Sequence, residues 1–257
     1  MCGIVGYIGD KDAVGVIVDG LKRLEYRGYD SAGVAVLGPE GLEVRRAAGR
    51  IKVLEGLLRE RPVHGSIGIG HTRWATHGRP TDDNAHPHTD GSGTLVVVHN
   101  GIIENYLPIK ERLSAEGHVF RSETDTEVIA HLIERHLKDT PRLDEAVRRA
   151  LRELRGSYAI VVLSKGAPDR LVAAKHGAGS VVVGLGQGET YLASDIPALL
   201  AHTRDVIILE DEDVVVVTRH GAEHIDLPVV DRAFFHANVA VSSMFFVFTL
   251  LDRLLQT

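Results

Sequence analysis

The sequence predicts an α+β fold, because many short apolar runs typical of strands are interspersed with a few segments of helical periodicity. Between residues 157 and 218 one strand-like run follows another, interrupted only by a short helical segment at about 196–201. The longer helical segments lie before residue 157. With 257 residues, 44% of them hydrophobic and 25% charged, the chain can bury a core as one large domain or two small ones.

The first half opens with a predicted buried strand over residues 3–8, which is apolar and has glycines where a backbone or ligand must approach closely. A helix is predicted over 12–25, because apolar side chains recur along one face. Two strands, 31–37 and 41–46, are expected to form a hairpin. Two further predicted strands end in polar residues, which is how strands deliver side chains to a site: 66–71 and 94–99.

The remaining elements follow the same signals. Helices are predicted over 104–116, 124–138 and 143–154, the second with Thr124 as its N-cap. The predicted strands after them cover residues 158–163, 170–174, 180–184, 190–193, 206–209 and 214–218.

Residues 227–257 differ in character from the rest of the chain. No formally charged residue lies between Arg232 and Asp252, a stretch that just reaches the length of a membrane-spanning helix. Polar residues such as His236 and Asn238 make it a poor one. A buried or interface segment, or non-native sequence from an altered gene end, is therefore favoured over a membrane anchor.

Composition excludes several classes of function. The formal net charge of −6 provides no broad basic field, so nucleic acid is not expected as a partner. No export signal is evident, and a single cysteine cannot form a disulfide within the chain, which fits a reducing cytoplasm. His77, His86 and His88 lack the paired-ligand spacing of zinc patterns, so neither a metal site nor a cofactor is predicted.

The single cysteine stands at position 2. Removal of Met1 would give Cys2 a free α-amine beside its own thiol. With an amine pKa near ~7.7–8.0 and a thiol pKa near ~8.5, nucleophile and base would lie within one residue. The alternative is a chance cysteine that is buried as a small hydrophobe. Cys2 by itself leaves these two interpretations nearly balanced.

Four other segments are polar and punctuated by glycine: 26–33, 71–78, 99–101 and 123–126. Each also has an ordinary structural interpretation. The first and third could be turns that end a helix and a strand. Asp125 in the fourth could merely complement a helix N-terminus.

Together these segments resemble, in order, the glutaminase domains of glucosamine-6-phosphate synthases. The resemblance rests on MCGIVGYIG at the start, YRGYDSAG from Tyr26, HTRWATHG from His71, VVVHNGIIEN from Val96 and SETDTEVIAH from Ser122. It continues through LRGSY and ASD and covers roughly residues 2–225. Arg-Gly before Tyr-Asp-Ser-Ala-Gly separates this family from purine-pathway amidotransferases and asparagine synthetases, which share the Cys-Gly start.

The resemblance implies catalytic roles for five residues. Cys2 would attack the side-chain amide of glutamine and form a thioester. The side chain of Asn100 and the backbone N–H of Gly101 would form the oxyanion hole. Arg27 and Gly28 would orient Cys2 and its amine.

It also implies a binding site for free L-glutamine. Arg73 would hold the α-carboxylate with a two-pronged contact that lysine cannot reproduce. Asp125 would hold the α-ammonium, with Thr76 and His77 beside the substrate. Trp74 would lie beside the exit for ammonia.

The fold implied by the resemblance is the N-terminal-nucleophile hydrolase sandwich, with four αββα layers and a lid over residues 73–91. It assigns residues 1–226 to the glutaminase domain and leaves 227–257 as a divergent apolar tail. The sugar-isomerase domains that bind fructose 6-phosphate in this family are expected in a full synthase and are absent from this sequence. Two alternatives stay open: a catalytically silent glutamine-binding module, for instance one that retains Met1, and the glutaminase domain of another class II amidotransferase.

Overall fold

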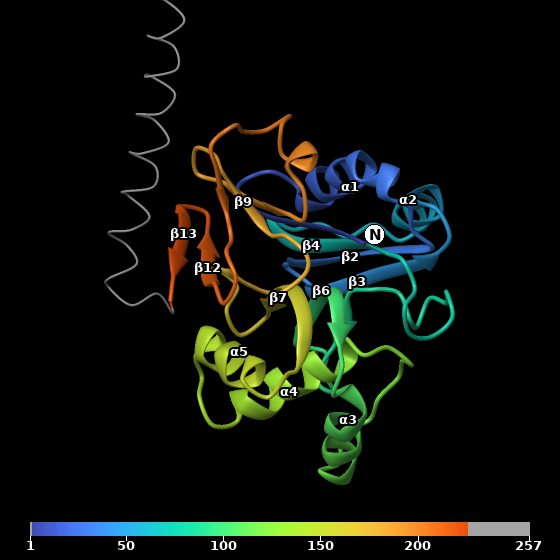
Figure 1. The fold of residues 1–257 in the computed structure, drawn as a ribbon. Coiled ribbons are helices and arrows are strands. Elements are labelled where there is room, and N and C mark those ends of the chain that lie inside the picture. Colours follow the sequence, from blue (N-terminus) through green and yellow to red (C-terminus); the bar gives the residue numbers. More distant parts are fainter. Residues whose placement is uncertain (1, 226–257) are drawn as a thin grey trace, which may run out of the picture.

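The computed structural model describes residues 2–225, which form two β-sheets stacked face to face with helices on both outer sides (Figure 1). The first sheet contains β1 (Gly3–Ile8), β2 (Ser31–Gly38), β3 (Gly41–Ala48), β4 (Ile67–Arg73), β9 (Val182–Leu185), β10 (Thr190–Ala193) and β11 (Val206–Ile208). The second contains β5 (His88–Thr89), β6 (Leu95–Ile103), β7 (Gly156–Ser164), β8 (Leu171–His176), β12 (Val214–Thr218) and β13 (Gly221–His224). The helices are α1 (Ala13–Arg23), α2 (Ile51–Glu60), α3 (Tyr106–Ala115), α4 (Glu127–Leu137) and α5 (Leu143–Leu151), with short 3₁₀ turns η1 (Glu25–Arg27) and η2 (Ile196–Ala198).

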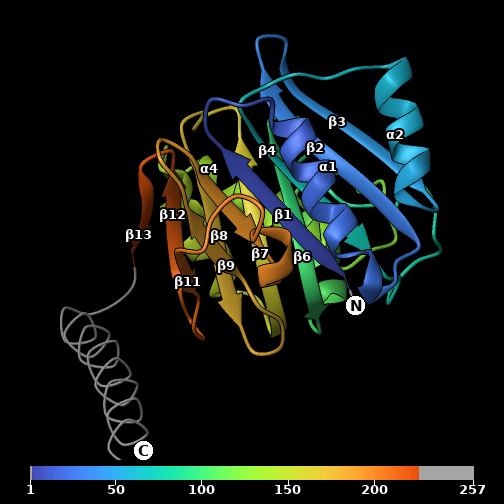
Figure 2. The same ribbon diagram turned by 90° about the horizontal axis from the view of Figure 1, so that it is seen from above.

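Both sheets are antiparallel. Their strand orders are β11-β9-β10-β1-β4-β2-β3 and β13-β12-β8-β7-β6-β5. Helix α1 packs against the two central strands β1 and β4 (Figure 2). Because β1 and β4 pair antiparallel, the start of β1 lies beside the end of β4, with Gly3 opposite Thr72.

Alternation of side chains along the strands builds the core between the sheets. On β1, Ile4 and Ile8 belong to the cluster between the two sheets, whereas Val5 and Tyr7 belong to the cluster under α1 and α2. All four are almost fully buried. Because both faces of β1 are covered, the strand reads as a continuous apolar run, as the sequence predicted.

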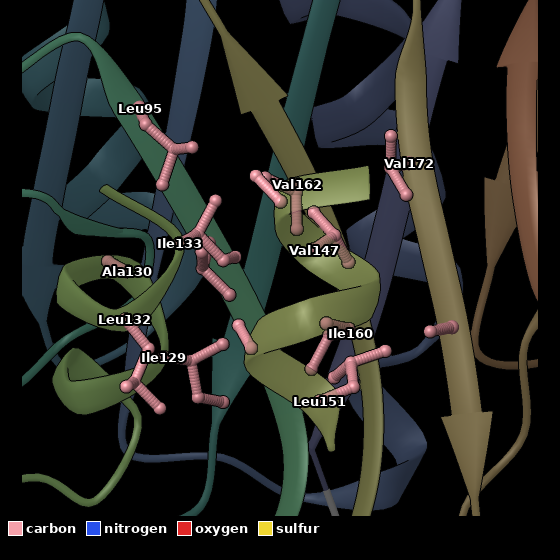
Figure 3. Close-up of a cluster of buried hydrophobic side chains, with 14 of the residues drawn as sticks. Leu95, Ile129, Ala130, Leu132, Ile133, Val147, Leu151, Ile160, Val162 and Val172 are labelled. Atoms are coloured by element: carbon pink, nitrogen blue, oxygen red, sulfur yellow. The ribbon is translucent and has the colours of Figure 1, made fainter. Parts of the chain in front are cut away.

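The second sheet is covered by α4 and α5. On β6, Val96 and Val98 face the first sheet, whereas Leu95 and Val97 face the helices. Figure 3 shows this outer cluster, in which Ile133 of α4 lies near Leu95. Each fully buried aliphatic side chain of this kind contributes about 1.5–3 kcal/mol. The resulting layers, helix–sheet–sheet–helix, confirm the predicted α+β class and the four-layer αββα sandwich.

Two local expectations need correction. Helix α2 was not predicted, although Ile51 and Leu54 repeat at helical spacing and are fully buried. Thr124 is not the N-cap of α4: the cap position is Thr126. The Oγ1 of Thr124 instead lies 2.9 Å from His88 Nε2, so this hydroxyl ties the loop before α4 to the second sheet.

The predictions for the tail at 227–257 and for the removal of Met1 lie outside the described residues. Within residues 2–225, no helix combines the length and the apolar character needed to cross a membrane.

Candidate active site

A cleft of about 450 Å³ opens where β1 begins and where β4 and β6 end. Its walls come from both sheets and from the loops that follow these strands. It is lined by Cys2, Arg27, Arg73, Trp74, Thr76, His86, His99, Asn100, Gly101, Ile102, Asp125, Thr126, Ser157, Ala178, Gly179 and Ser180. Eight of the ten predicted site residues are in this set; Gly28 and His77 are not.

Cys2 directly precedes β1 and is held in place by the backbone that follows β4. Its Sγ accepts a hydrogen bond from the backbone N–H of Trp74 at 3.2 Å. Burial raises the pKa of the Cys2 thiol, and the Trp74 N–H opposes that shift because it favours the thiolate. The thiol therefore needs a base nearby to become nucleophilic at neutral pH.

The side chain of Asn100 is oriented by His71 across the gap between the sheets. His71 follows Ile67 and Ile69 on the inner face of β4, and Asn100 follows Val96 and Val98 on the inner face of β6. The two side chains meet with His71 Nε2 at 2.8 Å from Asn100 Oδ1.

This contact determines which end of the Asn100 amide faces Cys2. Complete burial lowers the pKa of His71 to about 3, so the ring is neutral at pH 7. The Oδ1 of Asn100 can only accept, so His71 must carry its proton on Nε2. The amide nitrogen then points toward Cys2, where Nδ2 lies 3.4 Å from the carbonyl oxygen. By holding Oδ1, the neutral His71 turns the N–H groups of the Asn100 amide toward Cys2.

Gly101 follows Asn100 and cannot be replaced without strain. Its φ is 138°, and a Cβ there would lie 2.0 Å from the carbonyl oxygen of Ser157. The strand β6 can therefore bring its backbone to the cleft wall only with glycine at this position.

Arg73 is held by the loop that follows β4. Its guanidinium donates to the carbonyl oxygens of His77, of Gly78 at 3.3 Å and of Arg79 at 3.4 Å. The side chain is buried, and desolvation lowers its pKa while the charge of Asp30 opposes that shift. The arrangement places a fixed cation in the cleft wall.

Asp125 lies on the wall formed by the loop before α4. It is 4% exposed, and its Oδ2 accepts the backbone N–H of Ile103 at 2.8 Å. Its Oδ1 is 4.0 Å from His77 Nδ1. His77 stays outside the cleft lining, with its ring edge-on to Tyr106 and Nδ1 3.3 Å from Thr76 Oγ1.

Trp74 and Arg27 flank the sulfur. The indole of Trp74 is 55% exposed and packs on Gly28, where a Cβ would lie 2.8 Å from the ring. Arg27 donates through Nη1 to both the hydroxyl and the carbonyl oxygen of Ser194 at 3.2 Å. The same hydroxyl accepts the backbone N–H of Ile4 at 3.0 Å. Through Ser194, Arg27 is thus linked to the start of β1, which directly follows the nucleophile Cys2.

Comparison with known families agrees with this geometry. Residues 71–201, which are half of the chain, match the family described as "Glutamine amidotransferase domain". The chain belongs to this family.

Relatives of this amidotransferase chain share its sequence over most of its length. It is 57% identical over 229 residues to a protein of Thermus thermophilus, named glutamine–fructose-6-phosphate aminotransferase [isomerizing]. It is 52% identical over 227 residues to a protein of the same name from Caldanaerobacter subterraneus. In each case the match covers 88% of this chain and 37% of the relative, so the chain spans well under half the length of these proteins.

Solved structures show the same architecture. A glutamine phosphoribosylpyrophosphate amidotransferase from B. subtilis, complexed with ADP and GMP, matches with a TM-score of 0.75 at 26% identity, covering 87% of this chain and 49% of that one. A class II glutamine aminotransferase domain protein from Silicibacter pomeroyi matches in fold, with a TM-score of 0.59 at 17% identity over 88% of this chain and all of that one. The N-terminal-nucleophile hydrolase sandwich predicted for the amidotransferase chain is thereby confirmed.

Sequence analysis assigned no role to two residues that the geometry brings into the site, His71 and Ser194. A signal for His71 was available, because it continues the inward-facing series Ile67 and Ile69 at a spacing of two. Ser194 has no comparable signal, since its contacts with Arg27 and Ile4 span 167 and 190 residues of sequence.

Proposed function

We propose that the chain hydrolyses L-glutamine to glutamate and ammonia through a thioester on Cys2. The observation that carries this proposal is that Cys2 lines the cleft together with Asn100, whose Nδ2 lies 3.4 Å from the carbonyl oxygen of Cys2. The sulfur attacks the side-chain carbonyl carbon, the C–N bond breaks, and ammonia leaves. Water then attacks the thioester and releases glutamate with the free thiol.

The proton transfers use the α-amine of Cys2 after Met1 has been removed. This amine takes the thiol proton, gives it to the departing ammonia, and then takes a proton from the attacking water. The arrangement suits the raised pKa of the Cys2 thiol, because a base on the same residue needs no separate positioning. Arg27 and Gly28 keep this terminus in place, Arg27 through Ser194 and Gly28 by supporting the Trp74 ring.

The negative charge that forms on the amide oxygen is stabilised by Asn100 Nδ2 and the backbone N–H of Gly101. Loss of one oxyanion-hole donor costs about 2.7–4 kcal/mol in comparable enzymes. The neutral His71 contributes by fixing the Asn100 amide before the substrate arrives.

Free glutamine is selected by two charges of opposite sign. Arg73 and Asp125 both line the cleft, and they suit the α-carboxylate and the α-ammonium. Thr76 contributes a hydroxyl beside Arg73, and His77 supports Asp125 from behind. A glutamine within a peptide has neither charge and would supply no counter-charge to either buried residue. Trp74, at the exposed rim, is placed to cover the reacting groups.

The wider role we propose is supply of ammonia for making glucosamine 6-phosphate from fructose 6-phosphate. It rests on the names of the 52–57% identical relatives, which are far closer in sequence than the phosphoribosylpyrophosphate amidotransferase structure at 26%. Residues 1–226 would form the glutaminase unit, with a sugar-isomerase domain as its partner. A reducing cytoplasm suits the reaction, because oxidation of Cys2 would stop it.

The test is glutamate release by the full chain whose Met1 loss has been verified by intact mass. We expect turnover of glutamine in the wild type and none in Cys2→Ala, with both proteins equally folded by circular dichroism. Glutamine binding without turnover in the Met1-free wild type would instead identify a silent binding module. Turnover undiminished in Cys2→Ala would refute the proposed nucleophile.

A further inference from the structure

A second group of convergent side chains lies on the outer helical layer. His131 and Glu134 are three residues apart on α4, so they share one face of the helix. His118 reaches them from the segment that follows α3, which lies in the same layer (Figure 1). The three residues lie outside the lining of the catalytic cleft, and the proposed reaction does not use them.

We propose that His118, His131 and Glu134 bind one divalent cation of the zinc type, with water as the fourth ligand. The three residues each bring one possible ligand atom into a single group, in which all three atoms lie within 4.8 Å of one another. The two Nδ1 atoms are 3.0 Å apart. Glu134 Oε2 lies 3.2 Å from His118 Nδ1 and 3.4 Å from His131 Nδ1.

This triangle has the dimensions of one face of a zinc coordination tetrahedron. Zn–N and Zn–O bonds of about 2.0–2.2 Å place neighbouring ligand atoms of a tetrahedron ~3.3–3.6 Å apart. The observed edges differ from that range by at most a few tenths of an ångström. Two imidazoles and one carboxylate suit zinc and its neighbours in the first transition series, whereas calcium and magnesium require mainly oxygen ligands.

The tautomer of His131 supports the same conclusion. Its Nε2 lies 3.8 Å from Glu127 Oε1. Glu127 already accepts hydrogen bonds from the backbone N–H groups of Arg121 at 2.8 Å and Ser122 at 2.7 Å, so its carboxylate acts as an acceptor. The proton of a neutral His131 therefore belongs on Nε2, facing that carboxylate, and Nδ1 presents a lone pair to the cluster. A carboxylate that accepts the other ring N–H of a ligating histidine commonly supports a bound metal, and Glu127 would take that role by closing from 3.8 Å to hydrogen-bond distance.

The other walls of the cluster are also formed. Glu134 Oε2 accepts the backbone N–H of Gly91 at 3.1 Å, which fixes the carboxylate. The ring of Phe120 packs on His131 with centroids 4.4 Å apart. The side chains of His131 and His118 are 1% and 6% exposed, and that of Glu134 is 19% exposed. Water can therefore reach the fourth position from the Glu134 side.

Binding would fasten the segment between α3 and α4, which also carries Asp125. The experiment uses the full chain in a Cys2→Ala background, so that the thiol cannot chelate metal. After treatment with a chelator, zinc chloride is titrated by calorimetry, and cobalt(II) chloride is titrated by visible absorption. We expect one equivalent bound, the intense visible bands of tetrahedral cobalt, and a zinc-dependent rise in the midpoint of thermal unfolding.

The decisive variant is Glu134→Gln, which keeps side-chain shape at a partly exposed position and should fold. Loss of a partner that only supports a ligand costs about 10–100-fold in affinity, so loss of this ligand should cost more than ~100-fold. His118→Asn should behave likewise. The matched control is His136→Gln, because His136 lies on the same helix and its Nε2 is 2.6 Å from Glu153, outside the three-residue cluster. Failure of the parent chain to bind zinc, or unchanged affinity in Glu134→Gln, would overturn the proposal.

Discussion

The contact between His71 and Asn100 predicts that a residue with no access to substrate controls the rate of the chemical step. The perturbation is His71→Leu, which fills the buried position with an apolar side chain of similar volume and removes the donor to Asn100 Oδ1. Without that donor the Asn100 amide can rotate, and its nitrogen no longer faces the developing oxyanion at all times. His71→Gln is the rescue variant, because the amide nitrogen of glutamine can take the place of Nε2.

The expected magnitudes follow from the hydrogen bonds involved. Asn100→Ala removes the oxyanion donor itself and should lower kcat by about 10²–10³-fold. A neutral hydrogen bond contributes about 0.5–1.5 kcal/mol, so His71→Leu should lower kcat by ~2–13-fold. KM for glutamine should change little, because neither residue is placed at the α-carboxylate or the α-ammonium. His71→Gln should recover most of the lost rate.

The assay is steady-state glutamate release for the two single variants and the double variant, at a temperature where circular dichroism shows all of them folded. If His71 acts through Asn100, the double variant should be no slower than Asn100→Ala. His71 stacks on His86, so the control for loss of a stacked histidine is His202→Phe, at a residue that stacks on Tyr191 and lies outside the cleft lining. Independent, multiplicative losses for His71→Leu and Asn100→Ala would refute the reasoning.

Three further predictions concern binding, support and pH. Arg73→Lys keeps the charge but cannot keep the three carbonyl contacts, so KM for glutamine should rise at least ~10-fold, and an unchanged KM in the kinetic assay would contradict this. Gly28→Ala should destabilise the fold by about 1–3 kcal/mol and shift the fluorescence of Trp74, the single tryptophan, whereas Gly93→Ala, at a similar φ but with open space around it, should leave that fluorescence unchanged. Burial lowers the pKa of His71 to about 3, so the unfolded chain takes up a proton below pH ~6.5 that the folded chain does not. This residue should therefore lower the free energy of urea unfolding by about 2 kcal/mol at pH 5 relative to pH 7. Equal stability at both pH values would contradict the prediction.

Periodicity predicted the α+β class, because both faces of the central strands are covered and the strands therefore appear as continuous apolar runs. The four-layer sandwich was implied only by the family resemblance. Helix α2 was missed although its signal was present in the sequence, since Ile51, Leu54 and Leu58 recur along one helical face. The prediction of Thr124 as a helix cap was wrong because a threonine hydroxyl can equally well cap a helix or, as here, contact His88 across 36 residues of sequence. Local preference could not separate these two outcomes.

The candidate site divides in a similar way. Cys2, Asn100, Arg73 and Asp125 were assigned by resemblance, and the fold brings all four to one cleft. His71 was visible only as part of a motif, since its role depends on a partner in the opposite sheet. Contacts between strands of different sheets depend on how the sheets are stacked, and residue spacing along one strand cannot specify that.

The stacking of the sheets is also what links this site to the stability of the fold. His71 and Asn100 face the space between the sheets. Two residues earlier on the same strands, the inward-facing positions hold the core residues Ile69 and Val98. Two polar side chains in such positions are less favourable than a well-packed aliphatic pair unless they satisfy each other. Their mutual hydrogen bond limits that cost, and protonation of His71 would keep this bond but add a charge in a fully buried position. Protonation of His71 should therefore affect the core and the oxyanion hole together. Acid that charges this histidine should disturb both the catalytic amide of Asn100 and the packing of the sheets.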